Sequence, residues 1–295
     1  MTDTPRVRAF FDEPSKTISY LVWDETSGCG VVIDPVLDFN AASGDVGTQS
    51  ADALLAEADR EKVAIQWVLE THVHADHLSA AQVVKARTGA RIGIGAGICA
   101  VQAAFGPLLG AADVAGDGSE FDRLFADGDR LEVGGMTIHI LCMPGHTPAD
   151  VAYRIGDSVF VGDTLFMPDF GTARTDFPGG DAGLLYRSIR RLLGLPPETR
   201  LFMCHDYKAP GRDVYAWQSD VAAQRSDNVH VRDGVSEAEF VAMREARDAG
   251  LPPPALLYPA IQVNMRAGRF PPSGSDGARL LRLPVKLPAL DIDLF

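Results

Sequence analysis

The sequence has no apolar run long enough to cross a membrane, because its hydrophobic residues, 46% of the total, are interspersed with polar ones. Its first six residues, MTDTPR, also lack the basic and then apolar pattern of a secretory signal peptide. We therefore expect a cytoplasmic protein without membrane contact. Neither a repeat nor a linker divides the 295 residues, a length that suits one large domain, so we expect a single domain over residues 1–295.

Positive charge and cysteine are both scarce. The 27 Lys and Arg residues are outnumbered by 40 Asp and Glu residues, which gives a formal net charge of −13. Because phosphate binding requires Lys and Arg, this balance argues against a nucleic-acid partner. The four cysteines show no Cys-x-x-Cys spacing, so we expect reduced, mostly buried thiols and no disulfide framework. Among them, Cys204 is expected to be a small core residue at the end of a strand.

The hydrophobic pattern predicts both strands and helices. Turn residues bound the apolar runs, and Ser236 with Glu239 has the spacing of a helix capping box. A polar loop is expected at residues 39–50. We predict strands at 7–11, 17–23, 30–35 and 91–94, a hairpin at 130–141, and helices at 51–60, near 100–104, 184–193, 214–225 and 236–248.

Histidine is also rare, yet three of the seven histidines fall within six positions of one segment, THVHADH at 71–77. An apolar run at 63–69, typical of a buried strand, precedes this segment. The residues that follow, 78–86, have helical periodicity. The segment is therefore expected to turn from a strand into a helix, a place where side chains can converge on one point.

The side chains of this segment are metal ligands by type. Neutral imidazoles and carboxylates are the groups that zinc and iron prefer. Because side chains two positions apart leave an extended backbone on the same side, His72 and His74 are expected to face together. Asp76 and His77 lie where the chain turns and can face a second metal position. A solvated, His-rich loop is the alternative, but the density of ligand types favours a metal site.

The pattern His-x-His-x-Asp-His at 72–77 resembles the signature of the metallo-β-lactamase superfamily. The resemblance implies an α/β (α+β) fold, the αββα sandwich, in which two mixed sheets pack together, helices lie outside and the metal site lies at one edge of the sheets. Asp34-Pro35 resembles the acidic step at a strand end that supports the metal loop in this superfamily. The resemblance also implies three more ligands downstream, each after a strand.

Three residues match these downstream positions. His146 follows the predicted hairpin and a Pro-Gly turn, Asp163 follows an apolar strand at 158–161, and His205 follows another at 201–204. In dizinc members of the superfamily the corresponding positions are shared between two ions. One ion is held by the positions of His72, His74 and His146, the other by those of Asp76, His77 and His205, and that of Asp163 bridges them.

A different subset of the same residues suggests iron. His72, His146 and Asp163 supply two histidines and one carboxylate, the usual arrangement for non-haem Fe(II) oxygen chemistry. The other candidates would then be second-site residues, or would orient ligands and water around one ion. Ligand identity alone leaves one Fe(II) per chain and two Zn(II) both open. These other candidates are His74, Asp76, His77 and His205.

Segments away from the ligands resemble the persulfide dioxygenase (sulfur dioxygenase) branch, near its bacterial β-lactamase hydrolase-like members. They are Arg-Thr-Asp-Phe at 174–177, His-Asp-Tyr at 205–207 and Asn-Met-Arg at 264–266. The glyoxalase II branch usually has His-Glu-Tyr instead, followed by a helical glutathione-binding domain. Here a Pro-rich extension begins at about residue 251, and we expect it to wrap the domain as extended chain.

This resemblance implies oxidation of a low-molecular-weight persulfide, with glutathione persulfide as the first choice, by O₂ to sulfite and thiol. Arg174 would hold a carboxylate or the persulfide charge, and Tyr207 would donate a hydrogen bond to the bound sulfur or oxygen. The plain alternatives are a surface arginine and a core tyrosine. The rival hypothesis is a dizinc hydrolase of a thioester, lactone or β-lactam. Expected partners are the persulfide and O₂, with a homodimer left open.

Overall fold

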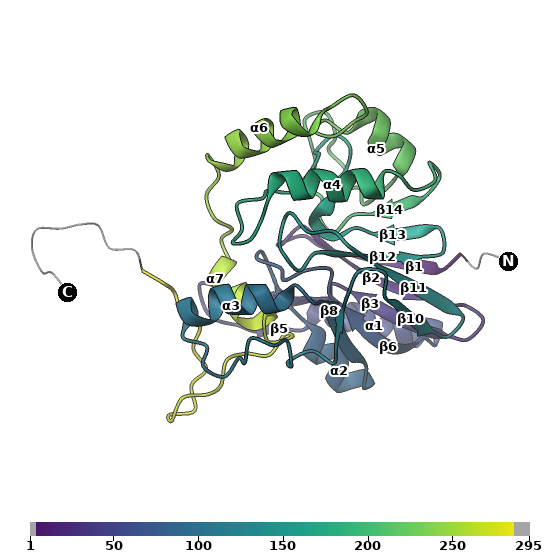
Figure 1. The fold of residues 1–295 in the computed structure, drawn as a ribbon. Helices are drawn as coiled ribbons and strands as arrows, with labels where there is room; N and C mark the ends of the chain where they lie inside the picture. Colours follow the sequence, from purple (N-terminus) through teal and green to yellow (C-terminus); the bar gives the residue numbers. More distant parts are fainter. Residues whose placement is uncertain (1–3, 286–295) are drawn as a thin grey trace, which may run out of the picture.

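The computed structural model describes residues 4–285 and shows two six-stranded sheets packed face to face, with helices outside both (Figure 1). This is the predicted αββα sandwich. In the first sheet the last four strands of the order given below run parallel to one another. Its order is β1 (Arg6–Asp12), β2 (Thr17–Trp23), β3 (Cys29–Ile33), β6 (Ala64–Leu69), β8 (Arg91–Gly95) and β9 (Arg123–Phe125).

The second sheet is antiparallel except where β13 and β14 run in parallel. A small third sheet, in the order β5 (Val46–Gly47), β4 (Val36–Phe39) and β7 (Leu78–Ser79), extends from the first. The second sheet contains, in order, β10 (Arg130–Val133), β11 (Met136–Cys142), β12 (Val151–Ile155), β13 (Ser158–Phe160), β14 (Arg200–Phe202) and β15 (Gln218–Asp220).

Apolar side chains from the two sheets form the core between them. Strand β11 alternates, with Met136, Ile138 and Ile140 buried and the residues between them partly exposed, as a strand with one face on the core must. The buried residues of β11 pack with large rings such as Trp67 and Tyr153, which are 2% and 0% exposed. This packing holds the ends of the strands in register, and those ends carry the candidate ligands.

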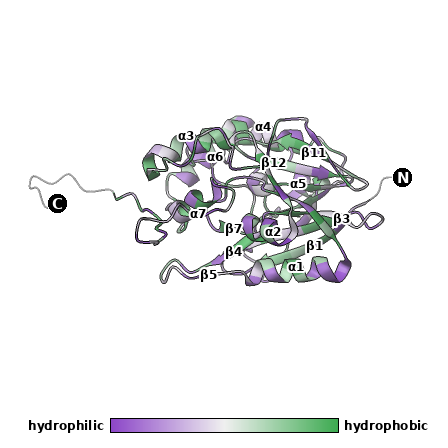
Figure 2. Cartoon of the chain, turned by 90° about the horizontal axis from the view of Figure 1, so that it is seen from below, coloured by the Kyte–Doolittle hydropathy of each residue, from purple (hydrophilic) through white to green (hydrophobic). Residues whose placement is uncertain are grey.

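The outer faces are covered by amphipathic helices (Figure 1). The buried face of the fourth helix carries Leu185, Ile189 and Leu192. Polar residues lie along the exposed side of the first helix (Figure 2). The first sheet is covered by α1 (Gln49–Glu61), α2 (Ala81–Thr88) and α3 (Ile98–Leu109). The second is covered by α4 (Ala182–Leu192), α5 (Val221–Asp227) and α6 (Glu237–Asp248). Within residues 4–285 no helix combines the length and hydrophobicity that a membrane span requires.

Several local predictions are confirmed, including the hairpin at 130–141 and the capping box in which Ser236 and Glu239 satisfy each other's backbone amides. The helix predicted at 214–225 is wrong in its first half. Residues 218–220 instead add β15 to the edge of the second sheet, and Asp220 then caps α5. The helix predicted from Leu78 begins three residues later, because Leu78 and Ser79 pair with β4.

The C-terminal extension also departs from the prediction of extended chain. It forms the helix α7 (Leu257–Asn264), which packs beside β7. Pro259 is compatible with this helix because it lies in the first turn, where its missing N–H has no intrahelical partner. The expected loop at 39–50 likewise contains the short strand β5, and the helix predicted near 100–104 extends over α3. Pro288 and the end of the extension lie outside the described residues.

Candidate metal centre

Every candidate ligand lies just beyond the end of a strand, at one edge of the sandwich. The segment 71–77 follows β6, His146 follows β11, and His205 follows β14. Asp163 lies in a single 3-10 turn (Gly162–Thr164) immediately after β13. The two sheets thus bring together side chains that are up to 133 positions apart in the sequence, between His72 and His205.

The first position of this centre consists of His72, His146 and Asp163. The Oδ2 atom of Asp163 lies 3.8 Å from Nε2 of His72 and 3.6 Å from Nε2 of His146, and the three ligand atoms lie within 4.8 Å of one another. Atoms bound to one ion at about 2.1 Å lie roughly 3–3.5 Å apart, so small side-chain movements suffice to enclose an ion. Nε2 of His72 is buried without a hydrogen-bond partner among the described residues, and so is Oδ1 of Asp163, on the side of the second position. These orphaned polar atoms fit a metal.

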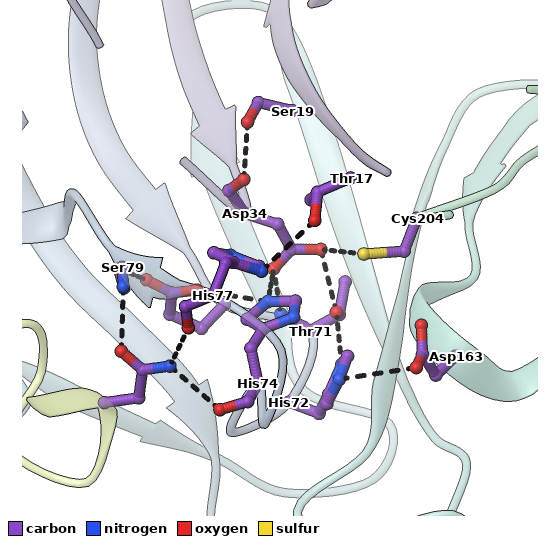
Figure 3. A network of polar contacts seen from close by, with 12 residues as sticks. Thr17, Ser19, Asp34, Thr71, His72, His74, His77, Ser79, Asp163 and Cys204 are labelled. Atoms are coloured by element: carbon purple, nitrogen blue, oxygen red, sulfur yellow. Dashed lines mark hydrogen bonds and ion pairs between the residues drawn. The ribbon is translucent and has the colours of Figure 1, made fainter. Parts of the chain in front are cut away.

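His72 is oriented by a chain of polar contacts that begins at the end of β3 (Figure 3). Asp34, whose positive φ of 50° turns it inward, accepts hydrogen bonds from the amide and hydroxyl of Thr71, at 2.7 and 2.8 Å. Because the Thr71 hydroxyl donates to Asp34, its oxygen is free to accept from Nδ1 of His72, 3.0 Å away. Nε2 of His72 then keeps its lone pair for a metal. Burial and the neighbouring imidazoles hold the pKa of His72 well below its usual value, so the ring stays neutral.

His146 is oriented in the same way from the opposite side. Its Nδ1 donates to the backbone carbonyl of Arg174 at 2.7 Å, which leaves Nε2 directed toward Asp163. Arg244 and Asp248 of helix α6 form a buried ion pair that holds this segment. Arg244 donates to the Thr172 carbonyl, and Asp248 accepts from the Thr175 amide. The backbone of the Arg-Thr-Asp-Phe segment therefore supports a ligand directly.

His74 lies beside His72, as its spacing predicts, with the two ring centroids 4.0 Å apart. Its Nε2 lies 3.1 Å from Asp34 Oδ1 and 3.6 Å from Glu70 Oε2, deep beneath the site. Burial alone would lower the pKa of His74, but the Asp34 carboxylate more than offsets this and raises it well above its usual value. The ligand atoms of His74 lie within 4.8 Å of those of Asp34 and Glu70, of Asp76 and His77, or of Cys204 and His205, but His74 does not join the group of His72, His146 and Asp163. Its Nδ1 is buried without a hydrogen-bond partner among the described residues.

The second position consists of Asp76, His77 and His205. Nε2 of His205 lies 3.5 Å from Asp76 Oδ2 and 3.4 Å from Oδ1 of Asp163, the oxygen that faces away from the first position. Nδ1 of His77 lies 3.5 Å from Asp76, but the His77 and His205 rings are 6.4 Å apart. Among the described residues Asp76 and His77 form a group within 4.8 Å with His74, and not with His205. Both histidines keep a buried Nε2 without a hydrogen-bond partner.

The two predicted substrate-binding residues lie in unequal positions. The guanidinium of Arg174 donates to both oxygens of Asp176, at 2.5 and 2.6 Å, and to the carbonyl of Pro252 at 2.8 Å, so its charge is already paired. Tyr207 is 42% exposed and stacks on His205, with ring centroids 5.6 Å apart. Tyr207 is thus at the rim of the centre, while the side chain of Arg174 is engaged within the protein.

Sequence reasoning missed several residues that shape the centre. Thr17 places its hydroxyl 3.2 Å from Nδ1 of His77 and 3.4 Å from Nδ1 of His205, and no motif marked it. Asn264 was noted only as part of a resemblance, yet it contacts the metal loop. Cys204 is buried, as predicted, and its thiol also donates to Asp34 at 3.6 Å.

Comparisons with known proteins agree with this geometry. The family profile described as the metallo-beta-lactamase superfamily matches residues 14–205. A probable metallo-hydrolase of Burkholderia pseudomallei is 51% identical over 95% of this chain and 98% of its own length. A beta-lactamase hydrolase-like protein of Xylella fastidiosa is 48% identical over 96% of this chain, which spans only 65% of that relative's length.

Two further matches carry the name ETHE1. The mitochondrial persulfide dioxygenase ETHE1 of Bos taurus is 30% identical over 90% of this chain and 91% of its own length. The crystal structure of ETHE1 from Myxococcus xanthus superposes with a TM-score of 0.72 at 32% identity, covering 90% of this chain and all of that one. Fold, ligand set and similarity together show that the chain belongs to the metallo-β-lactamase superfamily.

Proposed function

We propose that the protein is an Fe(II)-dependent persulfide dioxygenase that oxidises a low-molecular-weight persulfide, glutathione persulfide foremost, to sulfite and thiol. The observation that carries this proposal is the composition of the first position. His72, His146 and Asp163 converge there within 4.8 Å of one another, and His74, whose Nε2 is directed toward Asp34 and Glu70, does not join that group. Two histidines and one carboxylate, with open positions beside them, are the ligand set of non-haem iron oxygenases.

Bound Fe(II) supplies the electron transfer to O₂ that Zn(II), which has no redox chemistry, lacks. The protein keeps His72 and His146 in one tautomer each, through Thr71 and the Arg174 carbonyl, so that both present a lone pair at Nε2. Asp163 contributes the negative charge of the triad. In the overall reaction O₂ is reduced, the terminal sulfur is oxidised and water cleaves the S–S bond, so that RSS⁻, O₂ and H₂O give RSH, SO₃²⁻ and H⁺.

Aromatic side chains surround the approach to this centre. The ring of Phe177 lies 6.3 Å from that of His146, and Phe166 packs edge-on against both His205 and Tyr207. Such apolar walls exclude bulk water and suit a soft, polarisable persulfide sulfur. We assign the hydroxyl of Tyr207 to donate a hydrogen bond to the substrate from the rim, since this side chain is 42% exposed and its ring stacks on His205.

A dizinc hydrolase of a thioester, lactone or β-lactam is the second candidate. It is favoured by the two oxygens of Asp163, which face the first and second positions separately, as a bridging ligand requires. The names of the relatives divide in the same way, because those near 50% identity are named a probable metallo-hydrolase and a beta-lactamase hydrolase-like protein, and the one at 30% is named a persulfide dioxygenase. The dioxygenase is favoured because His205 lies outside the group that Asp76 and His77 form with His74.

Oxygen uptake distinguishes the two candidates. Protein purified anaerobically and loaded with Fe(II) should consume O₂ and release sulfite when glutathione persulfide is added, and the same protein loaded with Zn(II) should do neither. A hydrolase would ignore O₂ and cleave a thioester in its zinc form. Thioester hydrolysis by the zinc form, without O₂ uptake by the iron form, would overturn the proposal.

A further inference from the structure

The C-terminal helix α7 ends next to the loop that follows β6 and carries candidate metal ligands. This metal loop, residues 71–79, has no helix or strand before Leu78, so its shape depends on side chains that reach its backbone. Asn264, the last residue of α7, is one of these. Its amide nitrogen donates to the backbone carbonyls of His74 and His77 at 2.9 and 2.8 Å, and its oxygen accepts the amide of Ser79 at 2.8 Å.

We propose that Asn264 is a positioning residue for the metal centre, which sets the curvature of the metal loop and thereby the direction of its histidines. A carboxamide suits this task because it offers two donors and an acceptor on one planar group, while an ionised carboxylate can only accept. The group is 5% exposed, so water does not replace a lost bond readily.

The helix that carries Asn264 is itself held firmly. Ala260, Ile261 and Val263 are fully buried, and Arg266 forms a two-bond ion pair with Asp113, at 2.7 Å for each bond. Gln82 from α2 and Gln102 from α3 donate to backbone carbonyls just beyond the end of α7. Three separate contacts thus tie the end of α7 to the layer beneath the metal loop. The Asn-Met-Arg segment acquires a physical role from them: its asparagine contacts the loop and its arginine anchors the helix.

Gln262 provides a matched control on the same helix. It is 2% exposed, and its side chain also makes three hydrogen bonds of 2.8–2.9 Å, to the carbonyls of Tyr258 and Arg282 and from the amide of Arg282. None of these reaches the metal loop. Gln262→Ala therefore removes as many buried bonds as a change at Asn264 while leaving the loop contacts intact.

The test compares Asn264→Asp with Gln262→Ala by anaerobic Fe(II) titration against a chromophoric chelator and by the ligand-field absorption of the Co(II)-substituted protein. We expect Asn264→Asp to weaken metal binding by about 10- to 100-fold and to change the Co(II) spectrum, since loss of outer contacts to a metal site has effects of this size. Gln262→Ala should lower Tm and leave affinity and spectrum unchanged.

If Asn264→Asp does not yield folded protein, Asn264→Ser gives the same comparison with a smaller, neutral side chain. Wild-type affinity and spectrum in a folded Asn264 variant would overturn the proposal. Equal losses of metal affinity in the Asn264 and Gln262 variants would overturn it as well, because they would show a general loss of stability. Both readouts are independent of catalysis, so this role can fail or hold separately from the dioxygenase proposal.

Discussion

The two metal positions share Asp163 but differ in how their histidines are held. In the first position each histidine has its own oxygen acceptor, the Thr71 hydroxyl for His72 and the Arg174 carbonyl for His146. In the second, the contacts are longer and partly shared: the Thr17 hydroxyl lies 3.2 Å from Nδ1 of His77 and 3.4 Å from Nδ1 of His205, and the Lys16 carbonyl lies 3.3 Å from Nδ1 of His205. Ligand types are similar in both positions, so the difference lies in the shorter, unshared hydrogen bonds that orient the histidines of the first.

Exposure differs in the same direction. The side chain of Asp76 in the second position is 26% exposed, whereas that of Asp163 is 11% exposed. Burial alone would raise the pKa of Asp76, but the neighbouring histidines, His205 first, lower it strongly, so this carboxylate is an anion near neutral pH. The Asp76 carboxylate therefore interacts electrostatically with His205 and His77 whether or not the second position holds an ion.

The largest effect that tests this comparison comes from Asp163→Ala. This change removes the only anionic ligand of the first position and the only group shared by both positions, so Fe(II) binding and persulfide-dependent O₂ uptake should both be lost. Metal analysis and an oxygen electrode measure the two. Retention of stoichiometric iron in the folded variant would contradict the assignment of the triad.

A smaller effect is expected from His205→Ala, and His72→Ala is its matched counterpart. If one ion occupies the first position, His205→Ala should keep most of its metal and lose part of its activity, while His72→Ala should lose the metal. A dizinc centre would instead lose about half its metal with His205→Ala. Metal counting on the two variants separates these outcomes and shows whether the second position holds an ion.

The smallest effect concerns Arg174. If it holds the substrate, losing a charge-assisted hydrogen bond of about 1.5–3 kcal/mol should reduce kcat/KM by roughly ten- to a hundredfold in Arg174→Ala, with metal affinity unchanged. Arg174→Lys should not fully restore it, because an ammonium does not reproduce the planar fork that grips Asp176.

If the side chain of Arg174, through Asp176 and Pro252, instead fixes the backbone whose carbonyl accepts from His146, metal affinity should fall together with kcat/KM in Arg174→Ala. The structure favours this second outcome, because the guanidinium is already paired with Asp176. Wild-type kinetics and affinity in Arg174→Ala would leave it a surface arginine.

Local sequence carried much of the fold. Alternating hydrophobicity located β11 and its hairpin, and the spacing of Ser236 and Glu239 located the start of α6, because both signals depend on neighbours within a few residues. The helix predicted at 214–225 failed at residues 218–220. These residues are polar and pair with β14 at a sheet edge, a contact that no local pattern reveals.

The sequence also predicted which residues are candidate ligands, because each of them follows an apolar strand and strand ends meet at one edge of a sandwich. The hydrogen-bond partners of His74 were not predicted. Its spacing from His72 predicts only that the two rings lie together, as they do with centroids 4.0 Å apart. Two buried carboxylates, Asp34 and Glu70, then determine where the imidazole points.

By itself, the sequence determined which residue types stand at the strand ends and in what order, and this placed the chain in its superfamily. Only the tertiary structure decided which of them act together. The pairing of Arg174 with Asp176, the position of His74 over two carboxylates and the contact of Asn264 with the metal loop all join residues through side-chain directions. Such directions depend on packing and burial across distant segments, and short-range sequence patterns do not encode them.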